Sequence, residues 1–377
     1  MEKEPKCIEH MLVRESACNP WNAINVPVCF SSTYEFDSLT EAELTFGGMT
    51  SNFCYSRLGN PTVCAFEDKM TEIESGLGTV AFSSGMAAIT AVILTVCKPG
   101  DIIMCVEEIY GGTHALLKSV VKGLNIKVIT FKPDMLDIPF TLTTKSHTRL
   151  IFVETPTNPS LHTIDLGGLM QVAGMFDDAY VCVDNTFATS FFQQPIYQHG
   201  VDISLHSTTK YIGGHGDLIG GCATVGAIPR LLHDLLEVKT KTGAIMDPMT
   251  AFLNLRGLKT LAVRMKQHTI NALTLTSLFD DLEFKHTYPG FGGMVSLDLG
   301  SRDNAKKFVE QLVGPKLAVS LGETQTLINV PALMTHATYS DEELKAIGIG
   351  PGQIRISVGL EEPCKLKEEF KKALEGV

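Results

Sequence analysis

Between about residue 60 and residue 207, short apolar segments alternate with longer segments of helical character, and this alternation most constrains the fold. The apolar segments are five or six residues long, too short for buried helices. Strands separated by helices of this length predict a mostly parallel sheet with helices on both faces, an α/β fold. The expected strands are "GTVAF" (78–82), "DIIMCV" (101–106), "IKVITF" (126–131), "RLIFVE" (149–154), "AYVCVD" (179–184) and "DISLHS" (202–207).

The chain changes character at both ends of this region. Residues 1–50 are rich in Asn, Pro, Ser and Thr, and we interpret them as an arm that packs on another surface. Residues 51–245 form the α/β domain. After residue 245 a long helical stretch (247–279) precedes an alternating strand, "GGMVSLDLG" (292–300). This pattern predicts a smaller α+β domain over residues 246–377.

Charge and composition exclude several classes of function. The formal net charge is -11 and the pI about 5.5, which argues against nucleic acid or an anionic membrane as a partner. The longest apolar stretch, residues 86–96, is far shorter than the roughly 20 residues that span a bilayer. The first ten residues lack a signal-peptide layout, so we expect a cytoplasmic protein. The ten cysteines show no CxxC pair and the histidines no HxxxH or HExxH pair, so we expect no metal site.

Polar residues follow the expected strands at the edge where a parallel sheet binds ligands. "SSGMAA" (83–88) opens a helix whose free N–H groups suit an anion, although Ser84 as an ordinary N-cap is an alternative. Tyr110 follows the second strand and suits either ring stacking or a place in the core. Further along, Asn158 follows Glu154, Asp184 ends a strand, and Lys210 closes "STTK".

Together these residues match the needs of pyridoxal phosphate. The cofactor requires a lysine for its Schiff base, a carboxylate at its pyridine nitrogen and a phosphate cup. Lys210 and Asp184 fit the first two roles, and Lys210 then serves as the general base and acid. Ser207 and Thr209 are expected to join Gly85 and Met86 at the phosphate. Two other interpretations of "YIGGHGDLIGG" remain open at this point: a nucleotide-binding glycine loop, whose spacing is absent, and closely packed strands beside a surface lysine.

Motifs in order along the chain resemble the pyridoxal-phosphate enzymes of Cys/Met metabolism. They are "YSRLGNPT" (55–62), "SSGMAA" (83–88), "ETPTNP" (154–159), "VDNTFATS" (183–190), "HSTTKYIGGHGD" (206–217), "SLGETQTL" (320–327), "MTH" (334–336) and "IRISVGLE" (354–361). The resemblance covers residues 20 to 377. It implies the fold-type I architecture of pyridoxal-phosphate-dependent transferases and a homotetramer built from two intimate dimers.

The resemblance also implies roles for individual residues. Tyr110 resembles the ring that stacks on the cofactor and protonates the leaving group. Tyr55 and Arg57 resemble residues that reach the phosphate of the neighbouring subunit, so that each site is shared. Arg355 resembles the clamp on the substrate α-carboxylate, which Ser320 and Asn158 assist.

Departures from the family pattern bear on the substrate. Ala115 and Gln325 stand where cystathionine γ-lyases carry an arginine and a glutamate, which favours an apolar substrate tail. We therefore expect a methionine γ-lyase-type carbon–sulfur lyase that converts L-methionine or homocysteine to 2-oxobutanoate, ammonia and a thiol by α,γ-elimination. Gly112 and Thr240 depart from the methionine γ-lyase pattern, whereas Asp217 agrees with it. The alternatives are cystathionine γ-lyase or γ-synthase, O-acetylhomoserine sulfhydrylase, and a binding homologue without catalysis.

Overall fold

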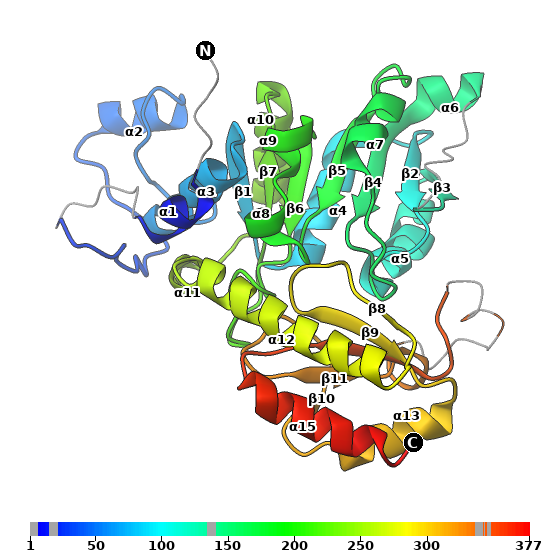
Figure 1. The fold of residues 1–377 in the computed structure, drawn as a ribbon. Helices are drawn as coiled ribbons and strands as arrows, with labels where there is room; N and C mark the ends of the chain where they lie inside the picture. Colours follow the sequence, from blue (N-terminus) through cyan, green and yellow to red (C-terminus); the bar gives the residue numbers. More distant parts are fainter. Residues whose placement is uncertain (1–6, 15–21, 134–140, 336–341, 343, 345–347) are drawn as a thin grey trace.

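The computed structural model describes residues 7–14, 22–133, 141–335, 342, 344 and 348–377. They form a large domain around one sheet and a smaller domain around a second sheet, with an arm at the side of the large domain (Figure 1). Residues 1–6 and 15–21 of the predicted arm lie outside the described part of the chain.

The large sheet has seven strands in the order β1-β7-β6-β5-β4-β2-β3. Strands β6, β5, β4, β2 and β3 run parallel, and β7 is antiparallel to both of its neighbours. The mostly parallel sheet predicted from the sequence is thus confirmed. The strands are β1 (Gly78–Phe82), β2 (Ile102–Val106), β3 (Lys127–Phe131), β4 (Thr148–Glu154), β5 (Tyr180–Asp184), β6 (Ile203–His206) and β7 (Gly221–Val225).

Helices cover both faces of this sheet. In one layer α4 contacts both α5 and α10, and in the other α9 contacts both α3 and α7. Apolar residues of the strands, such as Phe82, Ile103 and Phe152, fill the core between sheet and helices. The helices of the large domain are α3 (Pro61–Glu74), α4 (Gly85–Val96), α5 (Gly111–Leu116) continued by a π-turn (Leu117–Val121), α6 (Leu142–His147), α7 (Leu166–Ala173), α8 (Thr189–Phe192), α9 (Pro195–His199) and α10 (Pro229–Thr242).

The small domain has a five-stranded sheet in the order β10-β11-β12-β9-β8. Apolar residues of α12, α13 and α15, Phe279, Phe308 and Phe370 among them, pack with the strands in a separate core. The long helical stretch expected over 247–279 is two helices, which are separated at Lys259 and Thr260. The elements are α11 (Pro248–Leu258), α12 (Leu261–Asp281), β8 (His286–Thr287), β9 (Met294–Asp298), α13 (Arg302–Gln311), β10 (Lys316–Leu317), β11 (Leu327–Asn329), a 3-10 turn (Pro331–Leu333), β12 (Gln353–Ser357) and α15 (Pro363–Leu374).

The arm carries two short helices, α1 (Ile8–Val13) and α2 (Leu39–Phe46). It joins the large domain at Asn60, whose side-chain oxygen caps α3 by accepting from Thr62 N and Val63 N, and whose amide donates to Cys29 O. The domain boundary predicted at residue 245 falls between α10 and α11, and α11 still packs on α3. Within the described ranges, no helix is both long and apolar enough to cross a membrane.

Candidate active site

Two cavities lie between the domains, one of about 690 Å³ and one of about 710 Å³. The predicted site lies in the cavity of about 710 Å³. It lies where β4, β5 and β6 end, at the position expected for a ligand of a parallel sheet. Ten of the predicted residues line it together: Gly85, Met86, Tyr110, Asn158, Asp184, Ser207, Thr209, Lys210, Ser320 and Arg355. Tyr55 and Arg57 do not line this cavity. Arg57 instead donates to Thr240 O at 2.9 Å and lies over the Tyr55 ring.

Lys210 projects from the turn that follows β6 toward the small domain. Its Nζ donates to Ser320 Oγ at 2.8 Å. Burial, together with the positive charge of Arg355, lowers the pKa of Lys210 to about 8, and the carboxylate of Glu323 opposes this shift. A usable fraction of neutral amine therefore exists near neutral pH, as a lysine nucleophile or base requires.

Asp184 ends β5 with one carboxylate oxygen engaged and the other available. Thr186 donates to Oδ1 from its backbone N at 3.1 Å and from its hydroxyl at 2.5 Å. Oδ2 accepts no hydrogen bond from the described residues. Burial raises the pKa of Asp184, whereas the two Thr186 donors and the neighbouring His206 lower it. The available oxygen can therefore receive a positively charged N–H group in the cavity.

A buried acid–base pair lies behind Asp184. His206 Nε2 is 2.6 Å from Glu74 Oε1, which also accepts from the Ser190 hydroxyl, and both members of the pair are fully buried. Neither Glu74 nor His206 was among the residues expected at the site. Their signal was weak, because Glu74 lies 132 residues from His206 and only the fold brings the two together.

The start of α4 supplies a cradle for an anion. Ser84 is the N-cap, since its Oγ accepts from Ala87 N at 3.1 Å, which confirms the ordinary interpretation of this serine. The cap leaves the N–H groups of Gly85 and Met86 without acceptors in the described part of the chain, as is usual in a first helical turn. A Cβ on Gly85 would lie 2.8 Å from the Ser207 Cβ, so only glycine permits this approach.

The two hydroxyls expected beside the cradle have different surroundings. The Ser207 hydroxyl makes no hydrogen bond with the described residues. The Thr209 hydroxyl donates to Gly220 O at 3.2 Å and accepts from Gly220 N at 3.0 Å, so it also ties the lysine turn to the segment before β7.

Arg355 projects from β12 of the small domain toward the large domain. Nη1 donates to Asn158 Oδ1 at 3.1 Å and Nη2 to Ser320 O at 2.9 Å. Nε is buried and has no acceptor within the described ranges. Burial lowers the pKa of Arg355 to about 10, so the guanidinium remains charged at neutral pH. A carboxylate ligand would satisfy this charge.

Ser320, which links Arg355 to Lys210, adopts an unusual backbone conformation with φ of 82°. A non-glycine residue in this region is strained, and such residues cluster at functional sites. The neighbouring Gly322 also has a positive φ, and a Cβ there would lie 2.8 Å from Tyr211 N.

Tyr110 also lines the cavity and is 46% exposed. Its backbone N donates to Glu154 Oε2 at 2.9 Å, which fixes the turn between β2 and α5. Burial and the nearby Asp184 raise the pKa of Glu154 well above its ordinary value. A Cβ on Gly112 would lie 2.5 Å from the Tyr110 ring, so this glycine gives the ring its space.

Two residues on which the substrate expectation rested do not line the cavity. Ala115 is exposed on α5, and Gln325 donates to Gly314 O at 3.0 Å in a separate shallow pocket. The expectation that these two uncharged positions shape the substrate pocket is therefore not met by the chain's own cavity. The segment "SLGE" brings Ser320, Leu321 and Glu323 to the cavity, and Glu323 was not among the residues expected there although it lies three residues after Ser320.

The residues present fit pyridoxal phosphate. Lys210 would supply the amine, the available Asp184 oxygen would accept from a pyridinium N–H, and the N–H groups at the start of α4 with Ser207 would hold a phosphate. Tyr110 is an aromatic ring at the cavity wall that could stack on the cofactor.

Comparisons with known proteins agree with this geometry. A family model described as "Cys/Met metabolism PLP-dependent enzyme" matches residues 10–283 and 280–375. The L-methionine γ-lyase of Fusobacterium nucleatum subsp. nucleatum is 35% identical, with 95% of each chain covered. The cystathionine γ-lyase of Bacillus subtilis is 38% identical, covering 94% of this chain and 95% of that one.

Among solved structures, a putative O-acetylhomoserine (thiol)-lyase from Campylobacter jejuni, which contains N'-pyridoxyl-lysine-5'-monophosphate, superposes with a TM-score of 0.91 at 27% identity. The alignment covers 98% of this chain and 99% of that one. Fold, site and sequence similarity extend over nearly the whole chain. The chain therefore belongs to the pyridoxal-phosphate-dependent enzymes of Cys/Met metabolism.

Proposed function

We propose that the protein is a carbon–sulfur lyase of methionine γ-lyase type, which eliminates the thiol from the γ-carbon of L-methionine or L-homocysteine. The observation that carries this proposal is the apolar wall beyond Lys210. Phe187, Leu218 and Leu321 are buried there, and Ile219 and Val319 are exposed at its rim. An apolar wall suits a thioether or thiol tail.

Residues from both domains hold the substrate in this proposal. The charged fork of Arg355 binds the α-carboxylate, and Asn158 and Ser320 fix the orientation of that fork. The strained backbone of Ser320 and its contact with Lys210 then place the substrate α-carbon beside the lysine amine.

Proton transfer falls to Lys210 and Tyr110. Bound pyridoxal phosphate supplies the electron sink that stabilises a carbanion at the α-carbon. The Lys210 amine, with its pKa lowered to about 8, takes the α-proton and later a β-proton of the substrate. Tyr110 donates a proton to the departing sulfur. With one water consumed, methionine gives 2-oxobutanoate, ammonia and methanethiol.

A second candidate has support from one residue. The carboxylate of Glu323 lines the cavity and is not used in holding the cofactor or the α-carboxylate in the scheme above. It could pair with the distal ammonium of cystathionine. Cystathionine γ-lyase activity is therefore the second candidate, in agreement with the name of the Bacillus subtilis relative.

We also propose a cytoplasmic homotetramer with shared active sites. Tyr55 and Arg57 are remote from the chain's own cavity, which supports a role at the cavity of a neighbour. Unpaired buried thiols such as Cys105 and Cys182 suit a reducing compartment.

The deciding experiment measures 2-oxo acid and thiol release by the purified holoenzyme. The panel is L-methionine, L-homocysteine, L-cystathionine, L-cysteine and O-acetylhomoserine, the last with and without sulfide. We expect 2-oxobutanoate and methanethiol from methionine, with a kcat/KM above that for cystathionine. Turnover of cystathionine alone would instead establish the second candidate. Lys210→Ala should abolish turnover on every substrate while the protein remains folded, and near-normal activity of this variant would contradict the site assignment.

A further inference from the structure

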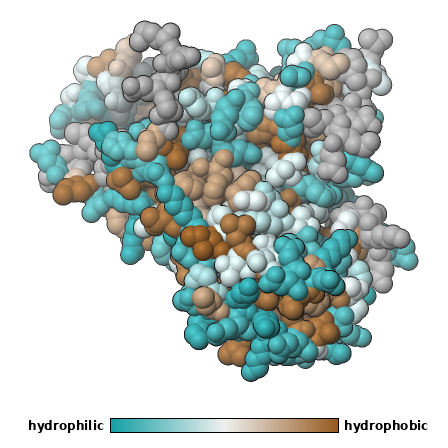
Figure 2. All heavy atoms as spheres, in the orientation of Figure 1, coloured by the Kyte–Doolittle hydropathy of each residue, from teal (hydrophilic) through white to brown (hydrophobic). Residues whose placement is uncertain are grey.

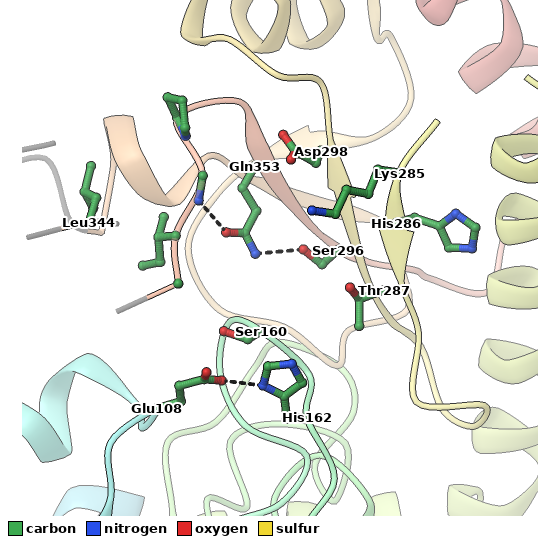
Figure 3. A pocket seen from close by; sticks show the side chains of 14 residues that line it. Glu108, Ser160, His162, Lys285, His286, Thr287, Ser296, Asp298, Leu344 and Gln353 are labelled. Carbon is green, nitrogen blue, oxygen red and sulfur yellow. Dashed lines mark hydrogen bonds and ion pairs between the residues drawn. The ribbon is translucent and has the colours of Figure 1, made fainter. Parts of the chain in front are cut away.

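A second interdomain cavity, of about 690 Å³, lies beside the active site and shares no lining residue with it (Figure 3). The large domain contributes Glu108, Ser160 and His162, and the small domain contributes residues of β8, β9 and the segment before β12. Its volume is within the range of small-molecule sites in proteins, roughly 300–1,000 Å³.

The large-domain wall contains a polar group without a partner. His162 Nδ1 lies 2.8 Å from Glu108 Oε2, which also accepts from the Thr157 hydroxyl, so this ion pair is satisfied. Ser160, in contrast, is only 9% exposed, and its Oγ has no hydrogen-bond partner among the described residues. Figure 3 shows this hydroxyl at the edge of the cavity. A buried hydroxyl without a partner costs free energy that a bound ligand can recover.

The small-domain wall presents two opposite charges that do not neutralise each other. The Lys285 ammonium makes no hydrogen bond or ion pair with the described residues, and it projects into the cavity (Figure 3). Asp298 accepts from Gly300 N at 2.9 Å through Oδ1, and Oδ2 accepts nothing from the described part of the chain. No ion pair joins Lys285 to Asp298 within these ranges, so both charges remain available.

The rest of this wall carries the Gln353 amide, an apolar part and the ring of His286, whose Nε2 lies 3.8 Å from Asp280 Oδ1. Gln353 donates to Ser296 Oγ at 2.8 Å and accepts from Gly350 N at 3.2 Å, so its amide is already engaged. The side chains of Leu344 and Ile349, both buried, form an apolar part of the lining.

We propose that this cavity binds a free α-amino acid with an apolar side chain. Lys285 receives the carboxylate, Asp298 receives the ammonium, and the Ser160 hydroxyl gains a partner. Leu344 and Ile349 contact the apolar side chain. A metal ion is a poor alternative because of the lysine, and the described residues hold no cluster of three metal-ligating side chains. A simple anion would leave Asp298 unpaired.

Because of the position of the cavity, an amino acid bound there can influence the active site. Glu108 lies two residues before Tyr110, Ser160 two residues after Asn158, and Gln353 two residues before Arg355. Three segments that present a residue to the active site thus also border this cavity. A ligand that contacts both Lys285 and the large-domain wall fixes the distance between the two domains. It thereby changes the affinity of the active site, which contains Arg355, for substrate.

The test measures binding rather than turnover, so it does not depend on the proposed function. The holoenzyme is treated with borohydride, which fixes the cofactor to Lys210, and is titrated calorimetrically with L-leucine. We expect one site per chain, and L-leucinamide and 4-methylpentanoate, which each lack one charge, should bind about tenfold more weakly or worse. Lys285→Gln and Asp298→Asn should each weaken L-leucine binding by about tenfold.

Lys306→Gln, a change of an exposed lysine on α13, is the matched control and should leave the dissociation constant within about twofold of wild type. The proposal is overturned if L-leucine gives no binding heat, or if Lys285→Gln and Asp298→Asn bind it as wild type does. Binding that survives Lys285→Gln but is lost in Arg355→Lys would place L-leucine in the active site and would equally overturn it.

Discussion

The amine of Lys210 experiences opposing charges. Burial and Arg355 lower its pKa to about 8, while Glu323 raises it. Both charged residues belong to the small domain, whereas the lysine belongs to the large domain. The reactivity of Lys210 therefore depends on how the two domains meet, because moving the small domain away would remove both charges at once.

A pH profile of cofactor capture tests this arrangement. Capture requires the neutral amine, so its rate in the apoprotein should fall about tenfold per pH unit below pH 8 and level off above it. An ordinary lysine would give a midpoint near 10.5. The measurement is stopped-flow absorbance after mixing with pyridoxal phosphate.

The variant Glu323→Gln sharpens this test. Because the carboxylate raises the pKa of Lys210, its removal should move the midpoint of the profile to lower pH. A wild-type midpoint above pH 10, or a midpoint that is the same in Glu323→Gln and wild type, would contradict the proposed effects of burial, Arg355 and Glu323 on the pKa of Lys210.

Thr186 should control the affinity for the cofactor through Asp184. Thr186→Val removes a hydroxyl that donates to Oδ1 and lowers the pKa of the carboxyl, at nearly constant volume. We expect the dissociation constant of pyridoxal phosphate, measured by equilibrium dialysis, to rise about tenfold. Thr186→Ser keeps the hydroxyl and should bind nearly as wild type does. Equal losses in both variants would indicate a packing effect instead.

At the residue scale, site residues that lie within local sequence motifs could be predicted from the sequence. Residues that only the fold brings together could not. Lys210, Asp184 and Arg355 lie in recognisable stretches, and all three line one cavity. Glu74 has no motif and reaches His206 only through the packing of α3 on the sheet. Ala115 and Gln325 were placed by motif position alone, which fixes the order of residues along the chain but not the direction of a side chain.

At the scale of elements, the strands from residue 78 to residue 206 were predictable because each is an apolar run bounded by polar residues. β7 was not, since it follows a glycine-rich segment and contains Gly221 itself. A Cβ at that position would lie 2.4 Å from Ser84 O. The glycine that weakens the strand signal is thus the residue that lets β7 pass the start of α4. The break between α11 and α12 at Lys259 and Thr260 has no proline to mark it, and the nearby Gly257 still lies inside α11.

The junction between arm and α3 depends on one side chain. Asn60 is 2% exposed, caps α3 and donates to Cys29 O at 3.0 Å. Asn60→Ala removes the cap and leaves buried groups unpaired, so we expect a loss of about 3 kcal/mol. The measurement is the urea midpoint by circular dichroism.

Asn60→Asp is the matched variant for this junction. It keeps the oxygen that caps α3 and removes the donor to Cys29 O, so its midpoint should lie between those of Asn60→Ala and wild type. Wild-type midpoints for both variants would show that the junction contributes little to stability.

At the scale of the whole molecule, the arm exposes more apolar surface than an isolated chain would favour. Ile24, Phe30, Leu39, Phe46 and Met49 are each at least 72% exposed. Figure 2 shows brown atoms on the side of the molecule where Figure 1 draws the arm. Exposed patches of this kind mark protein interfaces. We expect the arm to be covered by a second copy of the chain.

Complementation tests the shared site. Arg57→Ala and Lys210→Ala should each be inactive alone. The first variant lacks the arginine that reaches the neighbouring subunit's active site, and the second lacks the lysine of its own active site. After mixed refolding, a heterodimer places both lesions in one site and leaves the other intact. Random pairing then restores about a quarter of wild-type turnover. No recovery, with dimers shown by sedimentation, would refute the sharing of sites.

The reversed strand β7 also sets the order in which the nascent chain can complete its sheet. β1 pairs with β7 alone, and Phe82 finds its partner Gly221 only after 221 − 82 = 139 further residues have been made. Pairing over so long a separation is slow. Until β7 arrives, the edge of β1 and the part of α4 that packs on β7 remain uncovered on the ribosome, where exposed apolar surface favours aggregation. The cradle at the start of α4 is therefore one of the last parts of the large domain to form, and cofactor capture belongs to the end of synthesis.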